Sequence, residues 1–184
     1  AAIGYSQKTG KSFELGLIRN HYVGRTFIEP SQSIRSFGVK LKLSANISSL
    51  KNKSIILIDD SLVRGTTCHK IVKMLYDAGA KEVHVRIASP EIKYPDFYGV
   101  DMPTRGELAA AQRSVSEIEK YMGVDILMYQ KIDDLVEAVT RKGEHNIDRP
   151  CMACLNGQYV TGDIDEQTME NMEQQRNHER SQQK

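Results

Sequence analysis

The stretch from Ser54 to Thr67, SIILIDDSLVRGTT, constrains the fold of this chain more than any other segment. It begins with branched apolar residues at Ile55–Ile58, which lack the alternation of a half-exposed strand and predict a strand buried on both faces of a parallel sheet. Two aspartates and a polar loop follow, and apolar residues at helical spacing then predict a helix that stops at Gly79. The segment therefore predicts a strand, a loop and a helix in that order.

The loop between this strand and this helix is suited to an anion. Backbone N–H groups at Gly65, Thr66 and Thr67 would be free at the helix N-terminus, where the helix dipole favours negative charge. Just before the loop, Asp59 and Asp60 could accept hydrogen bonds from sugar hydroxyls or coordinate Mg²⁺. A ligand with a phosphate, a diol and a metal-bound polyanion would satisfy all of these groups. A phosphorylated ribose has this chemistry.

Two common nucleotide-binding motifs are missing from the sequence. It contains no Gly-x-x-x-x-Gly-Lys-[Ser/Thr], the motif of P-loop NTPases, and no Gly-x-Gly-x-x-Gly, the motif of dinucleotide-binding folds. On the pattern alone, one alternative stays open, in which Asp59 and Asp60 only cap the helix and the loop is solvated.

The remaining apolar patterns predict one α/β domain. We expect strands over residues 13–18, 55–58, 82–88 and 125–129, and helices over residues 1–9, 68–78 and 132–139. Two capping boxes, Thr104-x-x-Glu107 and Ser114-x-x-Glu117, each predict the start of a short helix. Because strands and helices alternate, we expect a mostly parallel sheet flanked by helices.

The charge distribution limits the choice of partner. Lysine and arginine total 25 against 24 aspartates and glutamates, but over residues 1–53 basic residues outnumber acidic ones by nine to two. A positive lobe before an anion loop could steer a charged small molecule, and the lack of interleaved aromatic residues argues against nucleic acid. No apolar run approaches the roughly 20 residues of a membrane span. With three cysteines, the chain is expected in a reducing compartment, the cytoplasm, and not in a membrane.

Residues 58–67 resemble the phosphoribosyl pyrophosphate (PRPP) signature of the type I phosphoribosyltransferases, in the form found in the glutamine PRPP amidotransferases, or amidophosphoribosyltransferases. Residues 19–30 resemble the flexible loop of that family, and residues 89–92 and 98–103 resemble the segment after its next strand. The resemblance runs from Ala1 to about Val160 and implies the type I phosphoribosyltransferase fold. We expect a domain over residues 1–162, truncated at its N-terminus before the first strand of the sheet, and a polar tail, either a frayed helix or disordered, over residues 163–184.

The resemblance implies an enzyme that transfers ammonia to PRPP and releases pyrophosphate. The product would be 5-phosphoribosylamine, in the first step of de novo purine biosynthesis, and the ammonia would come from glutamine through a glutaminase domain that this chain does not contain. The resemblance also implies Mg²⁺, purine nucleotides as feedback inhibitors and a homotetramer. Two alternatives stay open: another type I phosphoribosyltransferase, of purine salvage, and a non-catalytic sensor of PRPP or nucleotides.

The same resemblance assigns roles to individual residues. Asp59 and Asp60 would be catalytic and would hold the ribose hydroxyls and Mg²⁺. The residues that would bind the 5-phosphate are Ser61, Arg64, Gly65, Thr66 and Thr67. In the flexible loop, Tyr22 and Arg25 would be catalytic, and Arg19, which stands where the family usually has lysine, would bind the pyrophosphate.

The cysteines have two interpretations. By resemblance, Cys151 and Cys154 match two ligands of a [4Fe–4S] cluster in one branch of the family, whose third ligand falls at Asp96 and whose fourth would precede Ala1. The alternative is that both cysteines are reduced and buried. Cys68 is expected on the buried face of its helix and not as a nucleophile, because adjacent residues on a helix do not face each other.

Overall fold

The structure, a computed structural model, describes residues 1–20, 43–100, 102–141, 147 and 149–182. The chain divides into two compact units. Unit 1 comprises Ala1–Asp60, Gly65–Arg86 and Ser116–Met128, and unit 2 comprises Ser61–Arg64, Ile87–Val115 and Tyr129–Lys184. Within the described residues, no helix is long and apolar enough to cross a bilayer.

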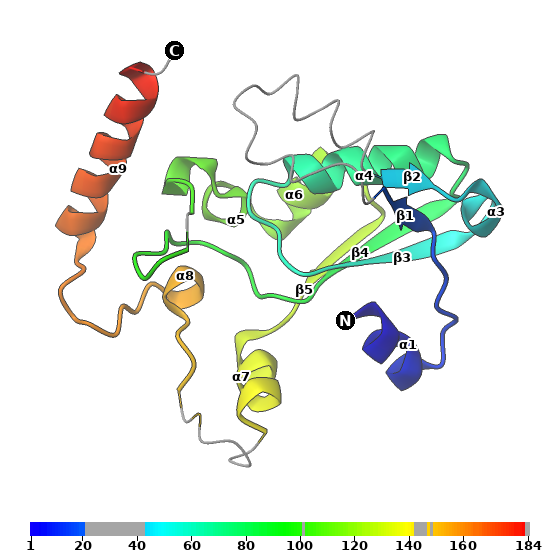
Figure 1. Ribbon diagram of the computed structural model, residues 1–184, viewed down its shortest axis with the longest axis horizontal. Helices are drawn as coiled ribbons and strands as arrows, with labels where there is room; N and C mark the ends of the chain where they lie inside the picture. The colour runs from blue at the N-terminus through cyan, green and yellow to red at the C-terminus, as the bar shows by residue number, and fades with distance from the viewer. Residues whose placement is uncertain (21–42, 101, 142–146, 148, 183–184) are drawn as a thin grey trace. The chain divides into compact units, whose positions relative to one another are not determined.

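Unit 1 is built on a parallel sheet. Its strands are β3 (Ser54–Asp59), β4 (Glu82–Ile87) and β5 (Ile126–Tyr129), in that spatial order. The central strand β4 has the predicted alternation, with Val83 and Val85 both 0% exposed. Figure 1 shows α4 (Thr66–Asp77) and α6 (Val115–Met122) on the same side of the sheet. The expected mostly parallel α/β architecture is therefore confirmed.

The helix α4 carries the main apolar face of unit 1. Its buried residues are Cys68, Ile71, Val72 and Leu75, as their helical spacing predicts, and each large aliphatic side chain contributes about 1.5–3 kcal/mol by burial. The ring of His69 stacks on Tyr121 of α6 with centroids 5.3 Å apart. The helix ends at the predicted stop, Gly79, whose φ of 91° is in the left-handed region. A second predicted helix, α1 (Ala2–Thr9), ends in the same way at Gly10.

The strand β3 is less buried than its sequence predicts. Residues 55–58 were expected to be covered on both faces, but all of them are only partly buried. Among the described residues, β4 is the sole strand neighbour of β3, so one edge of β3 is not covered by a strand. The apolar sequence predicts a strand correctly, but burial depends on neighbours that the sequence pattern does not reveal.

A separate two-stranded sheet pairs β1 (Leu17–Arg19) with β2 (Leu43–Ala45) in antiparallel register, and α3 (Ile47–Leu50) follows β2. The predicted strand over residues 13–18 is therefore wrong for most of its length. Phe13 and Leu15 are 47% and 66% exposed. Only the last residues of that segment find a partner strand, and without one an apolar alternation does not form β structure.

Unit 2 contains short helices around two apolar clusters. Its elements are η2 (Arg105–Glu107), α5 (Ala109–Gln112), α7 (Ile132–Thr140), α8 (Ala153–Asn156) and α9 (Glu166–Gln182). Leu108 centres one cluster with Ile92 and Leu155, and Met169 of α9 belongs to the other. Helix α7 confirms the predicted helix, whereas α8 was not predicted from the sequence.

The C-terminal segment is helical in α9, in line with the first of the two expected states, a frayed helix and disorder. Ionic contacts hold this helix. The backbone N–H of Arg105 donates to Glu173 at 2.7 Å, its Nε donates to the same carboxylate at 3.1 Å, and its Nη1 pairs with Glu166. Arg176 donates to the Met102 carbonyl at 2.6 Å. The hydrogen bonds from Glu173 and Glu166 raise the pKa of Arg105. The low number of apolar residues in this segment does not reveal these ionic contacts.

Asp125 joins the start of β5 to β4 in unit 1, and this contact gives a prediction. Its Oδ2 accepts hydrogen bonds from the Val83 N–H at 2.8 Å and the Tyr76 hydroxyl at 2.7 Å, which hold the Asp125 pKa below its usual range. The stabilisation is therefore present above the unfolded-state pKa of about 3.9 and is lost as the pH falls through the lower folded-state pKa.

We expect Asp125→Asn to lower the free energy of unfolding by about 1 kcal/mol at neutral pH, since the group is exposed, and to have little effect near pH 2. Thermal melts at both pH values measure this difference. As a comparison, Tyr76→Phe removes one donor and leaves the Val83 bond. An equal loss at both pH values would contradict the electrostatic explanation.

Candidate functional site

The two aspartates of the motif lie at the end of β3. Asp59 is the last residue of the strand and partly buried, and Asp60 follows it and is exposed. The Asp60 N–H donates to Asp59 Oδ1 at 3.0 Å. Burial raises the pKa of Asp59, the charge of Asp60 adds to this effect, and the N–H bond opposes it. A cation or hydroxyl donors beside the pair would offset the cost of holding two adjacent carboxylates ionised.

The N-terminus of α4 has the features of an anion site. Gly65 is the N-cap residue, with φ 76° in the left-handed region, where glycine is the residue that fits without strain. Glycine has no side chain with which to cap this terminus, and the N–H groups of the first turn have no acceptor within the helix itself. Thr66 and Thr67 are exposed in that turn.

The residues between the aspartates and Gly65 belong to unit 2. Leu62 is 2% exposed, and Val63 packs against the cluster of Leu108. The Ala109 N–H donates to the Val63 carbonyl at 2.8 Å. Arg64 is exposed, and its Nε donates to Glu107 Oε1 at 3.1 Å. Ser61 is partly buried.

Sequence reasoning missed Glu107 as a neighbour of the motif. The pattern Thr104-x-x-Glu107 was interpreted as a capping box, but Thr104 makes no side-chain cap bond. The Glu107 carboxylate bonds Arg64 instead. No local signal in the sequence indicates this contact, because Arg64 and Glu107 are 43 positions apart.

Cys68 is excluded as a nucleophile. It is 4% exposed on the buried face of α4, as expected. Burial, with a contribution from the charge of Asp59, raises its pKa to about 12. The thiol is therefore protonated at neutral pH.

The structure describes one of the three flexible-loop residues singled out from the sequence. Arg19 ends β1, opposite Leu43 of β2, and its side chain is exposed. Tyr22 and Arg25 lie outside the described residues. The placement of Arg19 in a strand differs from the expectation that the loop begins at this residue.

The structure does not confirm the [4Fe–4S] cluster that the resemblance implies at Cys151 and Cys154. Cys151 is exposed, and burial followed by the charge of Asp96 raises the pKa of Cys154. Asp96 is 8% exposed, and its Oδ1 already accepts the N–H groups of Tyr98 and Val100, each at 2.9 Å. Within the described residues, no three potential ligands are grouped to hold a metal ion. A [4Fe–4S] cluster usually takes four thiolates, and Asp96 would be a harder donor, so the cluster stays a prediction from the resemblance.

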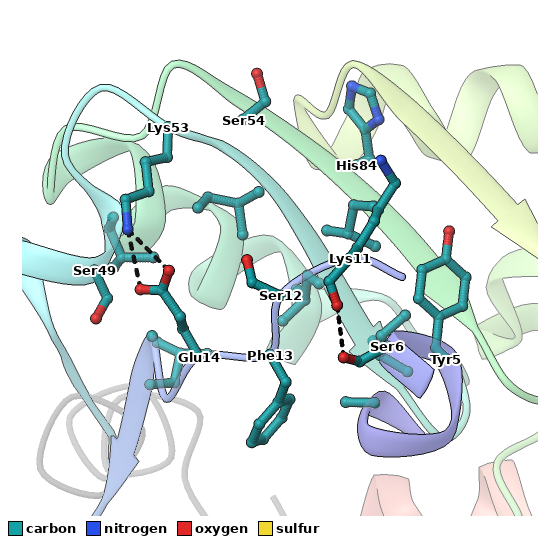
Figure 2. A pocket seen from close by; sticks show the side chains of 18 of the residues that line it. Tyr5, Ser6, Lys11, Ser12, Phe13, Glu14, Ser49, Lys53, Ser54 and His84 are labelled. Atoms are coloured by element: carbon teal, nitrogen blue, oxygen red, sulfur yellow. Dashed lines mark hydrogen bonds and ion pairs between the residues drawn. The ribbon is translucent and has the colours of Figure 1, made fainter. Parts of the chain in front are cut away.

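A cavity of about 660 Å³ lies along β3 in unit 1, away from the motif. Figure 2 shows its polar lining, with Lys53 paired to Glu14 at 3.0 Å and the Ser6 hydroxyl bonded to the Lys11 carbonyl. None of residues 59–67 lines it. The hollow follows the edge of β3 that lacks a strand neighbour among the described residues, so we interpret it as a consequence of that open edge and not as the anion site.

The chain is similar to curated amidophosphoribosyltransferases. It is 49% identical to that of Bacillus subtilis (strain 168) over 161 residues, 88% of this chain and 34% of the relative. It is 51% identical to that of Rhizobium etli over 164 residues, 89% of this chain and 32% of the relative. The chain thus spans about a third of the length of these relatives. No protein-family model matches it.

The solved structures agree with this similarity. The glutamine PRPP amidotransferase from B. subtilis, complexed with ADP and GMP, aligns over 86% of this chain and 35% of its own, with a TM-score of 0.73 and 48% identity. The parallel sheet flanked by helices, together with this structural match, shows the type I phosphoribosyltransferase fold. Within that class, the chain belongs to the amidophosphoribosyltransferase family.

Proposed function

We propose that this chain forms the PRPP-binding part of an amidophosphoribosyltransferase, which replaces the pyrophosphate of PRPP by ammonia to give 5-phosphoribosylamine in de novo purine biosynthesis. The observation that carries the proposal is the arrangement of residues 59–67, in which two carboxylates lie at the end of β3 and a helix with glycine as its N-cap residue begins at α4. Identity of about half to named members of the family supports it.

The 5-phosphate would bind at the start of α4. The N–H groups of Gly65, Thr66 and Thr67 supply donors, and the helix dipole adds favourable potential. Arg64 and Ser61, in the same loop, add a guanidinium and a hydroxyl. This arrangement anchors the substrate by a group that does not react, so binding energy positions the ribose C1 for attack.

The ribose and Mg²⁺ would be held by Asp59 and Asp60. Magnesium is usually bound by one or two carboxylates together with substrate phosphates, so an acidic pair fits it even though no group of three potential ligands occurs among the described residues. When bound, Mg²⁺ offsets the charge of the pyrophosphate. The carboxylates themselves accept bonds from the ribose hydroxyls and stabilise positive charge that develops on the ring as the bond to pyrophosphate breaks.

Arg19, Tyr22 and Arg25 are proposed to act at the pyrophosphate. Cationic side chains stabilise the charge on the leaving group, and a loop that covers the site excludes water, which would otherwise hydrolyse PRPP. Among these residues, the exposed side chain of Arg19 at the end of β1 is the described one.

Further properties follow from the family and stay proposals. Glutamine would supply ammonia through a glutaminase part of the relatives that this chain does not span. Purine nucleotides would inhibit, since a solved relative is complexed with ADP and GMP, and the assembly would be a homotetramer. Residues 1–162 would form the phosphoribosyltransferase domain, with 163–184 as a C-terminal segment held through Arg105. Three free cysteines agree with the cytoplasm.

Pyrophosphate release from PRPP tests the activity. With Mg²⁺ and ammonium, the protein is expected to release pyrophosphate in proportion to ammonia, and chelation of Mg²⁺ should abolish the release. Adenine, guanine or hypoxanthine in place of ammonia gives the comparison. Turnover with a purine base would support a salvage enzyme, and PRPP binding without turnover of any acceptor would support a sensor.

A further inference from the structure

The segment at residues 104–109 contacts the PRPP loop through both its backbone and a side chain. The Ala109 N–H donates to the Val63 carbonyl at 2.8 Å, and Glu107 Oε1 accepts the Arg64 Nε–H at 3.1 Å. Leu108, between these two residues, is 0% exposed and belongs to the cluster against which Val63 packs. The loop is therefore fixed to this segment at consecutive residues, just before Gly65.

The same segment is fixed on its other side by α9. Glu173 bonds both the backbone N–H and the guanidinium of Arg105, and Glu166 bonds the same guanidinium. The Arg105 carbonyl in turn accepts the Gln112 side-chain amide at 3.1 Å. Continuous contacts thus run from α9 through Arg105 and Glu107 to Arg64.

The ion pair of Arg64 and Glu107 is suited to orientation rather than to stability. The two side chains are 45% and 35% exposed, and ion pairs this exposed contribute little to folding. The bond engages Nε, which leaves the Nη donors of the guanidinium for an anion. Because a free arginine side chain loses several rotamers when it binds, holding it in one direction beforehand lowers the cost of binding. Without its pairing to Arg64, the Glu107 carboxylate would repel a phosphate bound nearby.

We propose that Glu107 is a positioning residue that aims the Arg64 guanidinium at the 5-phosphate of PRPP, and that α9 supports it through Arg105. The inference rests on the proposed function, because the phosphate of PRPP is the anion in question. The proposal gives α9 a role in ligand binding, which its amino-acid composition alone did not suggest.

Titration calorimetry on the purified protein and its Glu107→Gln variant tests the proposal, with Mg²⁺-PRPP, ribose 5-phosphate and pyrophosphate as separate ligands. We expect Kd for PRPP and for ribose 5-phosphate to rise about two- to fivefold, with Kd for pyrophosphate unchanged and the melting temperature within about 2 °C of the original. The Kd values of Glu107→Asp for PRPP and ribose 5-phosphate should lie between those of the original protein and those of Glu107→Gln. The matched control is Lys73→Gln, which removes another exposed ion pair, with Asp77 at 3.0 Å.

Two further variants test the support that α9 provides through Arg105. Arg105→Glu should weaken ribose 5-phosphate binding with the same ligand selectivity, and adding Glu173→Arg should recover part of the affinity. Unchanged ribose 5-phosphate binding in Glu107→Gln, or equal weakening of all three ligands, would overturn the positioning role. The proposed function has a separate test, because it fails when Asp60→Asn leaves PRPP binding unchanged, whatever Glu107→Gln does.

Discussion

Asp60→Asn is expected to lower the affinity for Mg²⁺-PRPP by roughly tenfold or more. Asp60 is exposed directly after β3, and a carboxylate there can accept bonds from ribose hydroxyls or ligate the metal. Charge-assisted hydrogen bonds contribute about 1.5–3 kcal/mol, so the loss of one corresponds to that factor. Titration calorimetry with and without Mg²⁺ measures it, and the loss should be larger when Mg²⁺ is present.

A matched control is Asp77→Asn, another exposed aspartate of unit 1, which pairs with Lys73 on α4. It removes the same charge from the protein without touching the motif, so PRPP affinity should stay within a factor of about two. Equal effects of the two substitutions would mean that net charge, and not the motif, determines the affinity.

Gly65→Ala is expected to weaken PRPP binding by at least about tenfold and also to lower stability. The φ of 76° at this N-cap costs a residue with a Cβ roughly 1–2 kcal/mol, and relief of that strain would shift the N–H groups that are proposed to bind the phosphate. The melting temperature should fall by several degrees. Thermal melts and calorimetry on the same samples measure both effects.

Gly10→Ala separates backbone strain from the loss of the anion site. Gly10 has a similar φ of 71° at the end of α1, and no atom lies within 4 Å of a Cβ built there. This variant should lose comparable stability and keep its PRPP affinity. If Gly65→Ala also kept its affinity, the backbone N–H groups of α4 would not be the phosphate site.

The elements that sequence predicts well are those whose residues determine their own environment. The alternation in β4 and the helical spacing of α4 correspond to faces that are buried against neighbours close in the chain, and Gly79 stops its helix because of its own backbone freedom. Residues 13–16 and β3 show the limit. Both segments have an apolar pattern typical of a strand. Whether the strand forms and how deeply it is buried depend on pairing with segments distant in the sequence.

The residues of the candidate site also divide into those that the local sequence predicts and those that it does not. Local chemistry predicts the acidic pair and the anion-binding helix start, because both lie within one short stretch of sequence. The contacts of Arg64 with Glu107 and of Arg105 with Glu173 join residues 43 and 68 positions apart. No local pattern encodes such pairs. The capping-box pattern at Thr104 even suggested a different use for the Glu107 carboxylate.

The central claim is that residues 59–67 bind PRPP, and a crystal structure of the protein with Mg²⁺ and PRPP tests it most directly. We predict the 5-phosphate on the N–H groups of residues 65–67 and the ribose hydroxyls on Asp59 and Asp60. PRPP bound instead among Lys11, Lys53 and Arg86 in the cavity along β3, or a motif without ligand at saturating PRPP, would contradict the account.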